Sequence, residues 1–133
     1  MALAADRNTP MEDGEEVGVP VAGGAKIFAG SLVVANATGY AAPGSTATGL
    51  TYLGRAEEFV DNTGGGDGAK TVRVRRRKAF LWKNSGTDPV DQSSLGKTVY
   101  IEDDETVSAT DGAGAQSAAG VMVGLDSAGV WVQ

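Results

Sequence analysis

Short alternations of apolar and polar residues recur along this chain, and no apolar pattern keeps a helical period for ten residues. A period of two predicts β-strands that turn one face towards a core. The first such run begins at Glu16 and continues to Val21. Because proline cannot donate a ladder hydrogen bond, Pro20 places this strand at a sheet edge or marks its end.

Glycine-rich turns separate the strand patterns that follow. Strands are expected over residues 26–35, 50–60, 71–82, 97–102, 106–110, 120–125 and 130–132. Gly30 predicts a bulge or a close backbone approach inside the first of these, and Asp91 is expected to cap one helical turn over 91–95. In the longest strand, Arg76 and Lys78 fall on the apolar face, where burying two cations costs several kcal/mol. We therefore expect a bulge or a solvent-facing opening near Arg77.

Strands at this spacing predict an all-β fold, a small barrel or a sandwich. Residues 15–133 are expected to form one domain, preceded by an extended N-terminal arm over residues 1–14 that lacks any periodicity. The alternating positions give the expected core: Val17, Val19, Val21, Ile27, Leu32, Val34, Leu53, Val72, Val74, Val99, Ile101, Val121, Val123, Val130 and Val132.

The 133 residues include neither histidine nor cysteine. This excludes Ser-His and Cys-His nucleophilic catalysis, zinc fingers and redox dithiols, so no enzyme activity, cofactor or metal site is expected. A net charge of −6 argues against nucleic-acid binding. No apolar run is long enough for a membrane span, and the N-terminus lacks the features of a secretory signal. Aromatic residues make up only 6% of the chain, which favours association with itself or with a partner.

Three motifs allow more than one interpretation. Residues 64–71 (GGGDGAKT) approach a phosphate-binding loop, but they lead into a strand pattern instead of a helix, so a flexible loop is the better interpretation. The basic run over 73–78 is either a charged outer strand face or a docking patch for an acidic partner. The acidic run over 102–105 lacks the spacing of a calcium loop and predicts a solvated hairpin tip.

Trp82 and Trp131 lie in apolar alternation, which favours packing over sugar stacking.

From residue 70 to 132 the chain contains, in order, Ala79-Phe80-Leu81-Trp82-Lys83, the turn Asp88-Pro89-Val90-Asp91, Leu95-Gly96-Lys97-Thr98-Val99-Tyr100, Ala119-Gly120-Val121-Met122-Val123-Gly124 and Gly129-Val130-Trp131-Val132. In this order of elements the chain resembles the capsid cement, or head decoration, proteins of tailed bacteriophages. The N-terminal half is similar to these proteins at Gly18-Val19-Pro20-Val21, and the opening Ala2 to Pro10 resembles Mu-like phage members. One departure is the absence of a glycine near Lys78, where the resemblance leads us to expect one.

The resemblance implies a β-tulip barrel that sits, often as a trimer, on the capsid exterior of a virion assembled in the host cytoplasm. Its partners would be the major capsid protein and further copies of itself. The candidate capsid-binding residues are Leu3, Asp6, Arg7, Pro10, Met11, Arg73, Arg75 and Arg77. The candidate subunit contacts are Val130, Trp131 and Val132. The alternative function is a carbohydrate- or receptor-binding β-module of a phage fibre or secreted protein.

Overall fold

The computed structural model describes residues 2–133, and nearly all of its regular structure is β-strand. The first half contains β1 (Glu16–Pro20), β2 (Lys26–Ile27), β3 (Leu32–Ala35), β4 (Ala41–Pro43), β5 (Thr51–Ala56), β6 (Val60–Asp61) and β7 (Thr71–Arg75). The second half contains β8 (Phe80–Asn84), the short 3-10 helix η1 (Gln92–Ser94), β9 (Thr98–Ile101), β10 (Thr106–Ser108), β11 (Ala118–Asp126) and β12 (Gly129–Val132). The predicted all-β fold is confirmed.

The first half of the chain forms an antiparallel sheet in the order β1-β7-β5-β3-β4, and β2 pairs with β6 in a separate ribbon. β1 lies at the sheet edge and ends at Pro20, as the sequence predicted. The sheet and the ribbon bury a first core, which consists of Val21, Ile27, Val33, Ala41, Ala56, Val60, Val72 and Val74.

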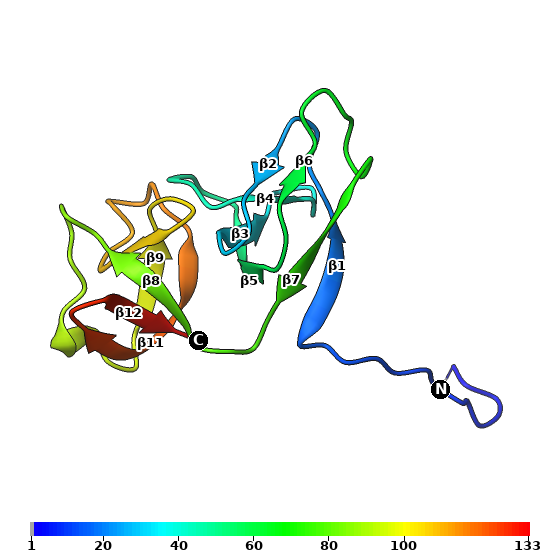
Figure 1. Ribbon diagram of the computed structural model, residues 1–133. Coiled ribbons are helices and arrows are strands. Elements are labelled where there is room, and N and C mark those ends of the chain that lie inside the picture. The colour runs from blue at the N-terminus through cyan, green and yellow to red at the C-terminus, as the bar shows by residue number, and fades with distance from the viewer. Residues whose placement is uncertain (1) are drawn as a thin grey trace.

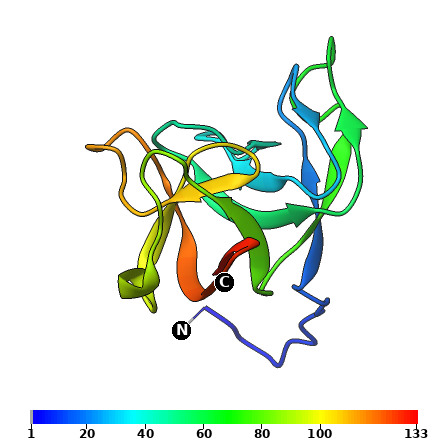
Figure 2. The same cartoon turned by 60° about the vertical axis from the view of Figure 1, so that its left-hand side comes forward.

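The second half closes into a barrel in the order β10-β8-β12-β11-β9, with β10 pairing back to β9. Among the barrel's strand pairs in the described residues, only β10–β8 is parallel. Figures 1 and 2 show the barrel beside the first sheet, linked through the segment between β7 and β8. A small barrel is therefore confirmed, but it occupies residues 80–132, whereas the sequence predicted one barrel domain over 15–133. The remaining strands form the five-stranded open sheet and the β2–β6 ribbon.

Strand β3 joins the two halves because both of its faces are buried. Leu32 and Val34 pack into the barrel core, and Val33 between them packs into the first core. The other fully buried members of the barrel core are Val99, Ile101, Val107, Met122, Val130 and Val132. An uninterrupted apolar run is the sequence signature of a strand covered on both sides. The shared strand makes the two cores parts of one packed body.

The longest expected strand is interrupted where the sequence places cations on its apolar face. β7 ends at Arg75 and β8 begins at Phe80, and between them Arg77 adopts a φ of 61°. The chain leaves the sheet here and enters the barrel, so the charged side chains avoid burial. The predicted irregularity near Arg77 is confirmed, and it is a crossing between two sheets.

Two other expected strands are also divided. The run over residues 26–35 breaks into β2 and β3 at a turn in which Gly30 has a φ of 83°. Gly30 is therefore a turn residue, and the bulge predicted there was wrong. The run over residues 50–60 breaks into β5 and β6. At Asp91 the prediction is confirmed, because its carboxylate accepts a hydrogen bond from Ser93 N at the start of η1.

The expected core needs correction at β11. Met122 is fully buried, whereas Val121 and Val123 are 39% and 45% exposed. The pairing of β11 shifts register between Ala118 and Val121 and again between Met122 and Gly124. These irregularities reverse which residues face the interior. Val17, Val19 and Leu53 lie at the margin of the first core and are only partly buried.

Candidate interaction surfaces

The N-terminal arm contains neither helix nor strand, and residues 2–13 are all exposed. Figure 1 shows the arm leading away from the sheet. Met11 is 98% exposed, and Leu3 is 61% exposed. Within the described chain, no hydrogen bond or ion pair joins residues 2–12 to the folded body. The arm therefore offers apolar side chains and free backbone groups to another molecule. Met1, the first residue of the predicted arm, lies outside the described residues.

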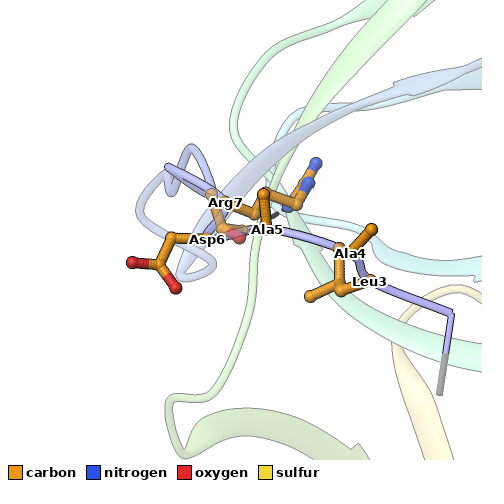
Figure 3. A pocket seen from close by; sticks show the side chains of 6 residues that line it. Leu3, Ala4, Ala5, Asp6 and Arg7 are labelled. Atoms are coloured by element: carbon orange, nitrogen blue, oxygen red, sulfur yellow. Dashed lines mark hydrogen bonds between the residues drawn. The ribbon is translucent and has the colours of Figure 1, made fainter.

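A hollow on the arm is lined by arm residues alone, from Leu3 to Thr9. Figure 3 shows the side chains of Asp6 and Arg7 pointing to different sides of the chain. Arg7 Nη1 donates to Thr9 Oγ1 at 2.6 Å, so this contact is local. The folded body contributes no wall to this hollow, and the shape of the arm alone creates it. The hollow is therefore no binding pocket, and the arm itself is the segment that would bind another molecule.

The basic run on β7 faces carboxylates of the same molecule. Arg73 bonds Glu58 at 2.7 Å and Glu16 at 3.1 Å, and Arg75 bonds Glu16 at 2.8 Å. Glu16 lies opposite Arg75 in the β1–β7 register, which explains the contact. The hydrogen bond and the charge of Glu58 raise the pKa of Arg73. This face is an ion-paired strand surface. It agrees with the interpretation of the basic run as a charged outer strand face.

These contacts neutralise part of the predicted basic patch. Arg73 and Arg75 are engaged by their own chain, and Lys78 pairs with Glu15 at 3.0 Å. Among residues 2–133, no ion pair engages Arg77, which is exposed at the bend between the two sheets. Of the three arginines in the basic run that were predicted to bind a capsid, only Arg77 has no ion pair within residues 2–133.

The last hairpin contributes to an apolar outer face of the barrel. Trp131 is 37% exposed and lies opposite Leu81 of β8, while Val121 and Val123 are exposed on β11. The side chains of Val130 and Val132 point inward and are fully buried. The prediction that Val130 and Val132 contact a neighbouring subunit was therefore wrong, because strand alternation directs both side chains into the barrel core. Leu81, Val121, Val123 and Trp131 form what we call the outer barrel face.

The two tryptophan side chains contribute more to contacts within the protein than to a ligand-binding surface. Trp82 is buried and donates to the Tyr52 hydroxyl at 3.1 Å, and burial raises the pKa of Tyr52 to about 12. Trp131 donates to Asp126 Oδ2 at 3.2 Å. Asp126 also accepts from the backbone amides of Ala128 and Gly129. The hairpin therefore engages Oδ1 of Asp126 fully and Oδ2 in part, so Oδ2 alone could accept from a sugar hydroxyl beside the ring.

Among residues 2–133, no group of three or more His, Cys, Asp or Glu side chains is placed to hold a metal ion. In the same part of the chain no helix has the length and apolar character needed to cross a membrane.

Sequence reasoning missed one feature, an exposed aromatic pair. Phe28 and Phe59 are 56% and 52% exposed, and their ring centroids lie 5.4 Å apart. Phe28 follows β2, and Phe59 precedes β6, its partner strand. The two rings are neighbours because this ribbon pairs, a contact between segments about thirty residues apart that no local pattern reveals.

Comparison with protein-family models, with curated proteins and with solved structures found no match to this chain.

Proposed function

We propose that this chain is a structural virion protein of a tailed bacteriophage that binds the outer surface of the assembled capsid. In this role it stabilises contacts between neighbouring major capsid subunits. The observation that carries the proposal is the arm over residues 2–13, which is exposed throughout; within the described chain, no hydrogen bond or ion pair joins residues 2–12 to the folded body. The resemblance described above supplies the class of partner.

The arm suits binding by strand addition or by lying along a surface. Pro10 fixes an extended backbone, and Leu3 and Met11 supply apolar side chains on either side of it. Ordering such a segment costs ~1–2 kcal/mol per residue in backbone entropy. New main-chain hydrogen bonds and apolar burial on the partner must exceed that cost. A large, fixed surface such as a capsid lattice provides both.

The outer barrel face supports association between copies of the chain. Its side chains are apolar and lie on three adjacent strands, β8, β12 and β11. Exposed apolar side chains gathered on one face are typical of protein–protein contacts. A trimer on the capsid exterior would cover this face and place several arms on neighbouring capsid subunits.

The proposal is tested by co-sedimentation with expanded capsid shells. The shells are assembled from the major capsid protein encoded in the same genome and are stripped of bound accessory proteins. The full chain should sediment with the shells, saturate at a fixed ratio to the capsid subunit and raise the temperature at which the shells break. Failure to bind shells at micromolar concentration would overturn the proposal.

A second candidate is a carbohydrate- or receptor-binding module, which the exposed Trp131 beside Asp126 favours. The same protein is therefore also applied to an array of bacterial surface glycans. Saturable glycan binding that is lost in Trp131→Ala, together with no shell binding, would replace the capsid proposal with this one. Shell binding without glycan binding supports the capsid role.

A further inference from the structure

A hollow of about 310 Å³ lies where the sheet and the barrel meet. One wall is the turn from Phe28 to Ser31, and the other is formed by Asp104 and Glu105 in the turn between β9 and β10. Backbone hydrogen bonds hold both walls. Ser31 N donates to Phe28 O at 3.2 Å, and Leu32 N donates to Asp104 O at 2.7 Å. The hollow is therefore part of the folded body, unlike the one on the arm.

Ser31 is an unusual part of this wall. It is only 7% exposed, and within the described chain its Oγ atom is buried with no hydrogen-bond partner. A buried hydroxyl without a partner is costly, and native proteins rarely keep one unless a ligand or water satisfies it. Ser31 thus points to a bound group that carries a hydrogen-bond donor or acceptor.

The carboxylates of residues 102–105, two of which line the hollow with Ser31, differ in what they already bind. Glu102 accepts from Ser85 Oγ at 2.6 Å, Asp103 accepts from the Glu105 amide at 2.9 Å, and Glu105 pairs with Lys83. Among residues 2–133, no hydrogen bond or ion pair engages the side chain of Asp104. Partial burial, followed by the charges of Asp103 and Glu105, raises its pKa. A cation placed in the hollow would relieve this repulsion.

An aromatic platform borders the same hollow. Phe28 lines it, and Phe59 packs against Phe28 with the ring planes tilted by 38°. Half-exposed rings beside carboxylates attract a flat, weakly hydrated cation, because the ring face is electronegative. The guanidinium group has that shape and carries five donors, whereas ammonium is compact and strongly hydrated.

We propose that this hollow binds an arginine side chain from an extended segment of a partner protein. The guanidinium would donate to the Asp104 carboxylate and to Ser31 Oγ and would stack against Phe28. The flanking residues of the segment would cover Phe59. A metal ion fits less well, since no group of three ligating side chains is placed to hold one within residues 2–133.

The occupant should come from another protein and not from the arm of a second copy. The arm carries Arg7, but it also carries Asp6, Glu12 and Asp13. Its net negative charge would oppose the acidic turn over residues 102–105. A segment with an arginine and no neighbouring acids has the complementary charge. The inference does not depend on the proposed function, since its test uses no capsid.

The test is a titration of the ¹⁵N-labelled full chain followed by NMR. The probe is acetyl-Ala-Arg-Ala-amide, and its control is the same peptide with citrulline, which keeps the shape and loses the charge. The arginine peptide should cause saturable shifts confined to residues 28–31, 59 and 103–105, and at least ~10-fold tighter than citrulline. A lysine peptide should bind more weakly than arginine.

Two variants keep the proposal falsifiable, and each is first checked by its thermal midpoint. Asp104→Asn and Ser31→Ala should both fold with an unchanged or higher midpoint, because each removes an unfavourable buried group. Both should weaken arginine binding, Asp104→Asn by at least ~10-fold. The matched control is Asp111→Asn, an exposed site with the same charge change, which should bind as the unaltered chain does.

Several results would overturn the inference. These are equal shifts from the arginine and citrulline peptides, shifts spread over the whole acidic surface, or undiminished binding by Asp104→Asn. Tighter binding by a peptide of residues 2–13 than by the arginine tripeptide would assign the hollow to a second copy of this chain and would also overturn it.

Discussion

Arg77 has a backbone conformation that favours glycine. Its φ of 61° lies in the left-handed region, and of the non-glycine residues described it shares a positive φ only with Ala113. A non-glycine residue held there costs of order 1–3 kcal/mol. The conformation persists because the chain must turn sharply from the end of β7 into the barrel.

Replacing Arg77 with glycine should therefore stabilise the fold. Arg77→Gly is expected to raise the free energy of unfolding by ~1 kcal/mol, since relief of strain exceeds the added entropy of the unfolded chain. The matched control is Arg76→Gly, at a position without a positive φ. It should lower the free energy of unfolding by ~1 kcal/mol. Urea denaturation measures both, and equal effects of the two substitutions would contradict this account of the bend.

Asp126 provides a residue-scale prediction about pH. Its hydrogen bond from Trp131 Nε1, and those from the amides of Ala128 and Gly129, lower its pKa. The folded state then binds fewer protons than the unfolded state near the carboxyl pKa. Its contribution to stability is present above the unfolded pKa of about 4 and is lost as the pH falls through the folded value.

Asp126→Ala should accordingly lower the thermal midpoint at pH 7, and the deficit should shrink as the pH falls below ~4. Asp111→Ala, at an exposed position, is the control and should show no such pH dependence. Calorimetry from pH 7 to pH 2.5 measures both variants. A deficit of constant size across this range would show that the carboxylate charge is not what stabilises the hairpin.

At the scale of elements, β11 tests how irregular pairing determines which side chains are buried. Met122→Ala removes a fully buried side chain and should lower the free energy of unfolding by ~2–5 kcal/mol. Val121→Ala, one residue away on the outer face, should change it by no more than ~0.5 kcal/mol. Denaturant unfolding distinguishes the two. A larger cost for Val121→Ala would restore the strand orientation that the sequence alone predicted.

The structure was predictable from the sequence where alternation is regular and where one residue determines the conformation of its immediate neighbours. Pro20 ended an edge strand and Asp91 capped a helical turn, because both effects are local. The position of Arg77 was also predictable, since cations on an apolar face cannot stay buried. The pairing partner of each strand was not predictable in this way.

The errors arise from contacts between distant segments. The register shifts of β11 depend on β9 and β12, so nothing within residues 120–125 shows that Met122 faces inward. Val130 and Val132 are a different case, because local alternation had already placed both in the expected core, and only their assignment as surface contacts was wrong. The arm was predictable from its lack of periodicity, and the structure adds that residues 2–13 are all exposed. The hollow at Ser31 joins residues more than seventy positions apart, which a single sequence does not reveal.

At the scale of the whole molecule, the outer barrel face predicts self-association. Light scattering of the full chain at micromolar concentration should report a multiple of 13.5 kDa. Trp131→Ser should shift the protein towards monomer, because it removes the largest ring from that face. Phe59→Ser, an exposed ring elsewhere on the molecule, is the control and should leave the assembly unchanged. A monomer that persists at millimolar concentration would contradict self-association of the free protein.

The central claim is that the arm attaches this body to a capsid. The most direct measurement compares the full chain with a variant lacking residues 2–13, which keeps Gly14 beside Arg77. Binding to undecorated shells is measured by co-sedimentation, and folding by the thermal midpoint. The account predicts an unchanged midpoint and an affinity lower by at least ~10-fold. Full-strength binding by the shortened chain would contradict it and would shift the docking role to the basic run over residues 73–78.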